Sequence, residues 1–403
     1  MTGIFNITVI VAALGYFVDV YDLILFSVVR VQSLKDLGFS GEELTTQGIY
    51  LINMQMAGML LGGILWGVLG DKRGRLSVLF GSIILYSVAN AANGMVTTIE
   101  GYALFRLLAG IGLAGELGAG VTLVSEILPK GVRGYGTAMV ASVGVLGALL
   151  AGVVAKTFDW RVAYYIGGGL GLMLLILRMQ VFESKMFQQA KAKAISRGNF
   201  LMLMLPGQVE RYLQCILIGV PIWFVIVLPI TLSPEFAQAL GVVEPINAGN
   251  ALMFCYFGLS LGDMASGLLS QRLKSRKKTV AIFLGLMTAS LLVFLNLKGM
   301  SAEMFYTLCT LLGFSAGYWA MFVTIGAEQF GTNLRATVAT TVPNFVRGSV
   351  IGVTSVFTLL RPQLGILSTT LVLGGILLVV AFGALYFLEE TFHKDMDYLE
   401  PLS

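Results

Sequence analysis

Six charged side chains interrupt otherwise apolar segments of this sequence, and the chemistry available to them is the first clue to function. They are Asp19, Asp22, Arg106, Glu116, Asp263 and Arg347. An acid or an arginine at the centre of a membrane-spanning helix costs roughly 2.5–3.5 kcal/mol on insertion scales. Side chains kept at that cost bind protons, ions or charged solutes, so each of the six is a candidate functional residue.

The two acids of the first apolar segment are candidates for proton coupling. Asp19 and Asp22 are three residues apart and share one helix face, with Tyr21 beside them. A rise of about 1.5 Å per residue places Asp22 and Arg106 at similar depth, so we predict an ion pair that breaks or protonates. Burial favours the neutral form of an acid, whereas a nearby arginine favours its ionised form. Two alternatives remain: a static pair that only orients two helices, or a proton carried by Asp19 or Glu116.

Arg347 is the candidate for binding an anionic group of a solute. Its planar guanidinium can donate two parallel hydrogen bonds to a carboxylate. The alternative is an ion pair between Arg347 and either Asp263 or Glu116. Further side chains could line the same site, although packing is the simpler explanation for any single aromatic. These are Tyr21, Gln55, Trp223, Tyr318, Trp319 and Asn344.

Long apolar helices must position these side chains. The chain is 57% hydrophobic and 12% charged, against about 45–50% and about 25% in soluble proteins. A spanning helix needs about 20 apolar residues. The sequence therefore predicts an all-α integral membrane protein with twelve spans, at 5–29, 47–70, 76–95, 102–127, 134–156, 161–181, 209–232, 248–271, 279–297, 302–327, 337–360 and 366–388. The short loops leave no room for a soluble catalytic domain.

Basic residues set the predicted orientation in the membrane. With the N-terminus inside, the cytoplasmic segments hold about eighteen Lys and Arg residues and the outer loops about six. Both termini are then cytoplasmic, in a multi-pass protein of the inner membrane. This topology explains the net charge of +4 without nucleic acid.

An internal repeat divides the chain. Residues 67–72 (Gly-Val-Leu-Gly-Asp-Lys) align with residues 267–272 (Gly-Leu-Leu-Ser-Gln-Arg). A Glu precedes an Arg by seven residues in both halves, at the same offset of about 200 residues. Duplication is the simplest explanation. The predicted organisation is a six-helix bundle at 1–181, a cytoplasmic linker at 182–208, a second six-helix bundle at 209–390 and a cytoplasmic tail at 391–403.

With these motifs the chain resembles the major facilitator superfamily over its whole length. The Gly-Asp-Lys-Arg-Gly-Arg loop at 70–75 is similar to the signature between helices 2 and 3 of that superfamily. A closer resemblance is to the metabolite:proton symporter branch and its sugar-porter and organic-ion relatives. It is carried by residues 19–22, 106–116, 159–161 and 328–337. Asp159 replaces a Gly of that pattern, and Gln271 replaces an acid. The resemblance implies two bundles related by a pseudo-two-fold axis, with a mid-membrane solute site between them that opens by rocking.

The resemblance also implies a cytoplasmic gate. Asp71 lies at the inner end of the second helix, where an acid can meet the positive N-terminus of helix 11. Positive-inside topology explains the basic residues of this region but not its acids. The predicted gate residues are Gly70, Asp71, Arg75, Glu126 and Arg133, with Arg272, Glu328 and Arg335 repeating the set.

The function predicted from the sequence is secondary transport by alternating access, with proton-coupled uptake of a small organic solute such as a carboxylate or amino acid. The alternatives are a uniporter or exporter of another solute, such as a sugar or an iron-chelating carboxylate, and a non-transporting membrane sensor. An enzyme is not expected. With one histidine, His393, and no Walker loop, no metal, cofactor or ATP is expected. The expected partners are the solute, protons and the lipid bilayer, and the expected state is a monomer.

Overall fold

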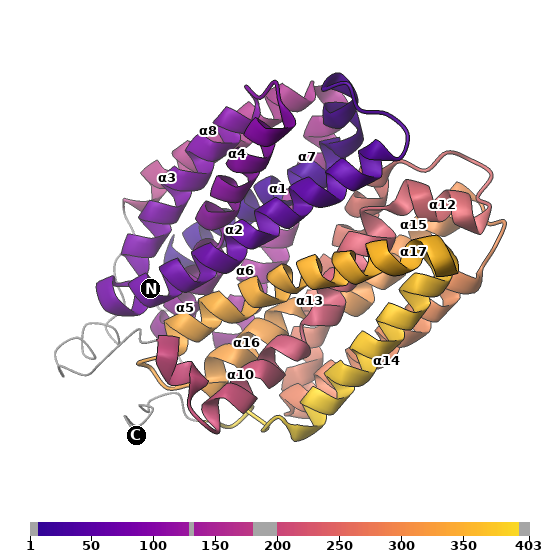
Figure 1. Ribbon diagram of the computed structural model, residues 1–403. Coiled ribbons are helices and arrows are strands. Elements are labelled where there is room, and N and C mark those ends of the chain that lie inside the picture. Colours follow the sequence, from indigo (N-terminus) through magenta and orange to yellow (C-terminus); the bar gives the residue numbers. More distant parts are fainter. Residues whose placement is uncertain (1–6, 129–132, 180–199, 395–403) are drawn as a thin grey trace.

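Long helices make up the protein, and the part of the chain that the structure describes contains no β-strand (Figure 1). The computed structural model describes residues 7–128, 133–179 and 200–394. Most of the predicted linker and the end of the tail lie outside these ranges. The elements are α1 (Ile7–Asp36), α2 (Glu43–Arg73), α3 (Arg75–Asn93), α4 (Ile99–Leu113), α5 (Glu116–Ile127), α6 (Arg133–Val145), α7 (Gly147–Thr157), α8 (Trp160–Arg178), η1 (Phe200–Met204), α10 (Gln208–Leu217), α11 (Val220–Val225), η2 (Ile226–Ile230), α12 (Ser233–Leu240), α13 (Ala248–Leu273), α14 (Arg276–Asn296), α15 (Ala302–Ala316), α16 (Trp319–Gln329) and α17 (Arg335–Phe387).

These helices account for the twelve predicted spans. Ten segments of the described chain are long and apolar enough to cross a membrane by length and composition. One of them, Thr337–Phe387, holds two spans, because the helix breaks at Gly365, which has φ 75° and ψ 166°. The remaining span is formed by α6 and α7, whose portion Ser142–Thr157 is a shorter apolar helix.

The helices form two groups that follow the chain order. In Figure 1, α1 to α8 lie on one side, in indigo to magenta, and α10 to α17 lie on the other, in rose through orange to yellow. The groups pack against each other where α2 meets α17 and where α13 meets α6 and α7.

Equivalent close helix crossings recur in the two groups. α2 crosses α4 at Gly58, where an added Cβ would meet the carbonyl oxygen of Leu107. α13 crosses α15 at Gly258, where an added Cβ would meet the carbonyl oxygen of Thr310. Small residues permit such backbone contact between membrane helices. The two glycines are 200 residues apart, which is the offset of the sequence repeat.

Three spans are interrupted close to functional side chains. The span of α4 and α5 breaks just before Glu116, and that of α15 and α16 breaks just before Trp319. In the span that begins with α10, the π-helix η2 contains Pro229 and follows directly after α11. Breaks of this kind expose backbone groups that a continuous helix would satisfy internally, and they recur at functional sites.

Candidate solute site, buried charges and gates

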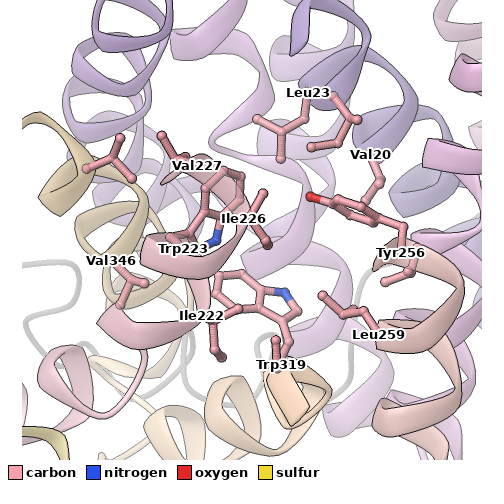
Figure 2. Close-up of a cluster of buried hydrophobic side chains, with 14 of the residues drawn as sticks. Val20, Leu23, Ile222, Trp223, Ile226, Val227, Tyr256, Leu259, Trp319 and Val346 are labelled. Atoms are coloured by element: carbon pink, nitrogen blue, oxygen red, sulfur yellow. The ribbon is translucent and has the colours of Figure 1, made fainter. Parts of the chain in front are cut away.

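A small cavity lies between the two groups of helices. Its volume is about 20 Å³, room for about one water molecule. Apolar and aromatic side chains from α1, α6, α11, η2, α13 and α16 surround it, and Trp223 and Trp319 lie next to each other in this cluster (Figure 2). The lining residues are Tyr16, Val20, Leu23, Val145, Ile222, Trp223, Ile226, Tyr256, Leu259, Trp319 and Arg347. Side chains must move apart before an organic solute can enter.

Arg347 is the charged side chain that lines this cavity. It is 1% exposed, and its guanidinium carbon lies 5.5 Å from the ring centroid of Trp223 and 5.3 Å from that of Trp319. Its Nη1 donates to Asn344 Oδ1 at 3.2 Å, while its Nε has no hydrogen-bond partner among the described residues. The two indoles hold the cation by cation–π attraction, which strengthens where water is excluded. This leaves a buried donor available to a ligand.

The predicted ion pairs of Arg347 are not formed. Asp263 Oδ1 accepts the backbone N–H of Ala320 at 2.9 Å, in the first turn of α16. The acid therefore caps the helix that follows the break in this span, where the helix dipole favours negative charge. Arg347 is the charged group that acts most strongly on Asp19, although the two side chains make no direct bond.

Glu116 does not pair with Arg347 either. It makes a two-contact ion pair with Arg178 of α8, and one of the contacts joins Arg178 Nη1 to Glu116 Oε2 at 2.8 Å. Arg178 also donates to the carbonyl oxygen of Leu79 at 2.9 Å, and both charged side chains are 1% exposed. α1 passes this pair at Gly15, where a side chain would collide with both partners. Glu116 is thus committed to a charge partner that the sequence analysis did not consider.

The predicted ion pair between Asp22 and Arg106 is also wrong for this conformation. Arg106 donates to Gln55 Oε1 and lies over the ring of Phe26, 4.7 Å from its centroid. Asp22 is fully buried, and neither of its oxygens has a partner among the described residues. Arg106 is still the charged group that acts on Asp22 through space. The two side chains are neighbours held apart by other contacts of the arginine.

Asp19 shares this lack of a partner. It is fully buried, and both of its oxygens lack hydrogen bonds within the described chain. The charged groups that act on it are Arg347, Glu116, Asp22 and Arg178, in decreasing order. Of the three acids predicted to carry a proton, Asp19 and Asp22 are therefore unpartnered, whereas Glu116 is paired.

Four of the predicted solute-contacting residues do not line the cavity. Tyr21 donates its hydroxyl to the carbonyl oxygen of Ala163 at 2.8 Å, and Tyr318 donates to that of Ile218 at 2.8 Å. Gln55 accepts from Arg106. Asn344 donates across the interface between the groups, to the carbonyl oxygen of Ala114 at 2.7 Å. Their hydrogen bonds hold helices together in this conformation.

At one end of the bundle, Asp71 joins the two groups. Its Oδ2 accepts the backbone N–H of Thr337 at 2.8 Å and the Thr337 hydroxyl at 2.6 Å, in the first turn of α17. Gly70, the residue before it, is buried in the same helix. This contact has the geometry expected of the predicted gate. The side chains of Arg75, Glu126 and Arg133 lie outside the described residues.

The second predicted gate set has a different partner. Glu328 pairs with Arg276, whose Nη2 lies 3.1 Å from Glu328 Oε1, and it also accepts from Thr391 at 2.7 Å. Arg272 is exposed, so it does not take the place that the repeat suggested. Arg335 is buried and donates to the carbonyl oxygen of Ala327 at 3.3 Å. The contacts of Glu328 within the described residues lie in the second half.

The opposite end of the bundle is also bridged. Arg30 Nη2 lies 3.1 Å from Glu235 Oε1, and the Thr45 hydroxyl donates to the same oxygen at 3.1 Å. Arg30 and Thr45 belong to the first group, and Glu235 belongs to α12 of the second. With Asp71 bonded at the other end, both ends of the interface carry a contact between the two groups.

Comparison with known proteins identifies the family to which this architecture belongs. A family model of the Major Facilitator Superfamily matches residues 12–360. The chain belongs to the Major Facilitator Superfamily.

Relatives in the superfamily are transporters, not enzymes. The niacin transporter NiaP of Acinetobacter baylyi is 27% identical over 382 residues, covering 83% of this chain and 82% of that protein. The benzoate transport protein of the same organism is 22% identical, covering 82% of this chain and 78% of that protein. The proton:xylose symporter XylE has the same fold, with a TM-score of 0.73 at 17% identity, covering 98% of this chain and 97% of that one.

Three residues of the buried ion pair and the cavity lining were not identified from the sequence. Arg178 falls within the predicted span 161–181 and was not among the six buried charges named from the sequence. Tyr16 and Tyr256 line the cavity, and Tyr256 turns its hydroxyl toward the middle of the cluster (Figure 2). The sequence did contain a signal for Tyr16. Tyr16, Val20 and Leu23 recur at the spacing of one helix face.

Proposed function

We propose that this chain takes up small organic carboxylates together with protons, by alternating access between the two groups of helices. The observation that supports this most directly is Arg347 in the cavity, buried between two tryptophans and holding an unpartnered donor. A buried cation is costly unless a charge of opposite sign compensates it. A carboxylate is the solute group that compensates it while matching the planar fork of the guanidinium.

The walls of the cavity favour a flat hydrocarbon or aromatic frame on that carboxylate. Trp223 and Trp319 have ring centroids 6.4 Å apart at an angle of 65°. Aromatic faces hold planar rings through stacked and edge-to-face contacts. The relatives named for niacin and benzoate carry planar carboxylic acids, which agrees with this chemistry. The lining offers few polar groups for the many hydroxyls of a sugar.

Proton coupling follows from charge. Moving one elementary charge through a membrane potential changes the free energy by about 2.3 kcal/mol per 100 mV. The membrane potential opposes the entry of an anion into a cell that is negative inside. A proton carried with the anion makes the transported charge zero, so the potential no longer opposes uptake. The unpartnered acids of α1 are available to carry that proton, and Arg347 acts through space on one of them, Asp19.

Alternating access would use the two bridged ends. The contact between Asp71 and Thr337 closes the end that we assign to the cytoplasm, and the contact between Arg30 and Glu235 closes the outer end. Opening one while the other stays closed exposes the cavity to one side at a time. The same proposal places the protein in the inner membrane with both termini cytoplasmic, and divides it at 1–181 and 209–390. Reporter fusions to each terminus would test the orientation.

A matched ligand pair tests the solute class. Purified protein is reconstituted into liposomes, and uptake of labelled nicotinate is measured with and without an imposed pH gradient. Nicotinamide is the control, because it keeps the ring and replaces the carboxylate with a neutral amide. We expect nicotinate, benzoate or muconate to raise the thermal midpoint and to accumulate with the gradient, and nicotinamide to do neither. Equal responses to acid and amide would overturn the carboxylate assignment, and accumulation without a pH gradient would overturn coupling.

A further inference from the structure

Asp22 and Asn90 are buried side by side inside the first group of helices, away from the cavity. Asp22 belongs to α1 and Asn90 to α3, and both are 0% exposed. The amide of Asn90 is a neighbour of the Asp22 carboxyl, yet all four polar atoms, Oδ1 and Oδ2 of Asp22 and Oδ1 and Nδ2 of Asn90, lack hydrogen bonds within the described chain. Buried polar groups are normally hydrogen-bonded, so four unpartnered atoms on two neighbouring side chains require an explanation.

The donor and acceptor sets of the two groups match in one protonation state. An ionised carboxylate only accepts hydrogen bonds, so it would leave the amide oxygen of Asn90 without a donor. A protonated carboxyl has one O–H donor and one carbonyl acceptor, and a carboxamide has one acceptor and an NH₂ donor. The two can form a ring of two hydrogen bonds that satisfies all four atoms. The match holds whichever way the Asn90 amide is turned, because neither of its ends is committed.

We propose that Asn90 positions the transported proton on Asp22, by forming a carboxylic acid–amide pair with it. This inference rests on the proposed function and identifies its proton site. When the site is open to the proton-rich side, the Asp22 carboxylate takes one proton from water, and the new O–H donates to Asn90 Oδ1. When it is open to the other side, the O–H bond breaks and the proton returns to water. No other bond changes.

The ionised form of Asp22 has a different partner close by. Nε and Nη1 of Arg106 are both unpartnered within the described residues, so the arginine has donors to offer. Asp22 thus alternates between a neutral pair with Asn90 and an ionic pair with Arg106. The other titratable groups around it are Tyr86 of α3, Tyr164 of α8, and Tyr21 and Asp19 of its own helix, with the Glu116–Arg178 pair beyond Asp19.

α8 passes the Asp22 carboxyl at Gly167. An added Cβ at Gly167 would meet Asp22 Oδ1 and the ring of Tyr21, so this glycine leaves the space that the carboxyl occupies. Gly169, on the same helix, has nothing within 4 Å of an added Cβ. The two positions therefore offer a perturbation of the site and a matched control.

The test compares Asn90→Leu with Asn93→Leu in proteoliposomes. Asn93 is on the same helix, is also 0% exposed and is also unpartnered within the described chain, so it controls for the loss of a buried amide. We expect Asn90→Leu to lower pH-driven nicotinate accumulation about tenfold, the equivalent of about one hydrogen bond. Counterflow, which needs no net proton movement, should stay near the wild-type rate in both variants. Gly167→Ala should behave like Asn90→Leu, and Gly169→Ala like the wild type.

Infrared difference spectra on acidification supply a readout that a merely structural role would not move. The wild type should show a carboxylic C=O band that disappears in Asp22→Asn and moves to higher frequency in Asn90→Leu, because the carbonyl loses its donor. The band should be unchanged in Asn93→Leu. A wild type that accumulates nicotinate with the pH gradient, with the band and uptake unchanged in both Asn90→Leu and Gly167→Ala, would overturn this inference alone. A wild type indifferent to the gradient would instead overturn the proposed proton coupling.

Discussion

The two groups of helices share an architecture but differ in how they use charge. The first buries Asp19, Asp22 and Glu116, two of which have no hydrogen-bond partner within the described chain. The second buries Asp263 inside a span, and this acid caps α16 by accepting the N–H of Ala320. What the second group supplies to the cavity is Arg347 with its flanking aromatic side chains.

We propose that this difference reflects a division of labour between the two halves. The glycine crossings that set helix geometry are kept in both halves at the same offset. The buried ionisable residues differ between the halves. In this proposal the reason is that a proton site and a carboxylate site require different side chains. A proton site needs an acid that is stable in two protonation states, whereas a carboxylate site needs a permanent cation. Separate halves allow each to be adjusted without disturbing the other.

The largest expected effect is on the Glu116–Arg178 pair, which holds the first group together. Glu116→Gln would leave Arg178 buried without a compensating charge. Removing one partner of a buried pair typically destabilises by about 3–5 kcal/mol. We expect a marked fall in the thermal midpoint of the purified protein in detergent.

Asp36→Asn is the matched control for this prediction. Asp36 pairs with Arg161 in the same half, but its side chain is 49% exposed. Exposed pairs contribute little to stability, so this variant should unfold near the wild-type temperature. If both variants lose the same amount of stability, the Glu116–Arg178 pair has no special role.

The second largest effect is expected at Arg347, the proposed carboxylate-binding residue of the second half. Arg347→Gln should weaken nicotinate binding about 100-fold, because two charge-assisted hydrogen bonds are lost. Calorimetric titration of the purified variant measures this affinity. Arg361→Gln is the control, since Arg361 is partly exposed near Glu42 and far along α17 from the cavity. An affinity kept in Arg347→Gln would move the carboxylate site elsewhere.

The two closed ends should respond in opposite directions. Asp71→Asn weakens the bonds to Thr337, and Glu235→Gln weakens the bridge to Arg30. We expect each substitution to change the free-energy difference between the open and closed forms of its end by about 1–2 kcal/mol. This alters the ratio of open to closed forms by a factor of about 5–30. Asp71→Asn should open the Asp71 end, and Glu235→Gln should open the other.

Spin-label distances across each end measure these populations. The three native cysteines, Cys215, Cys255 and Cys309, are buried, so background labelling should be low. Opening of the same end by both variants would contradict the assignment of the two contacts to opposite gates.

The smallest effect is expected at the buried acid of the second half. Asp263→Asn keeps an oxygen that can accept the N–H of Ala320, so helix capping survives. We expect pH-driven uptake within about twofold of the wild type, a change below about 0.5 kcal/mol that is typical of a tolerated substitution. Loss of coupling in this variant would mean that both halves handle protons.

The fold could be predicted from the sequence because hydropathy, span length and the repeat act over many residues. Interruptions of single helices, such as the one before Glu116, gave no comparable signal. Arg347 was identified as a cavity residue because a buried arginine needs a reason. Trp223 and Trp319 were named beside it on weaker grounds.

The pairing of the buried charges could not be predicted. Depth along a helix suggested that Asp22 meets Arg106, but the rotation of each helix and the reach of Gln55 decide which atoms touch. Arg178 reaches Glu116 from a different span, a contact that helix spacing cannot show. Burial depth can be estimated from one segment at a time, whereas side-chain partners depend on how several helices are packed.

The central claim is that the first half carries the proton and the second half binds the carboxylate. Asp22→Asn in proteoliposomes tests it most directly, with nicotinate counterflow and pH-driven accumulation measured on the same preparation. We predict that counterflow persists while accumulation driven by the pH gradient is lost. Accumulation at the wild-type level in Asp22→Asn would contradict the claim.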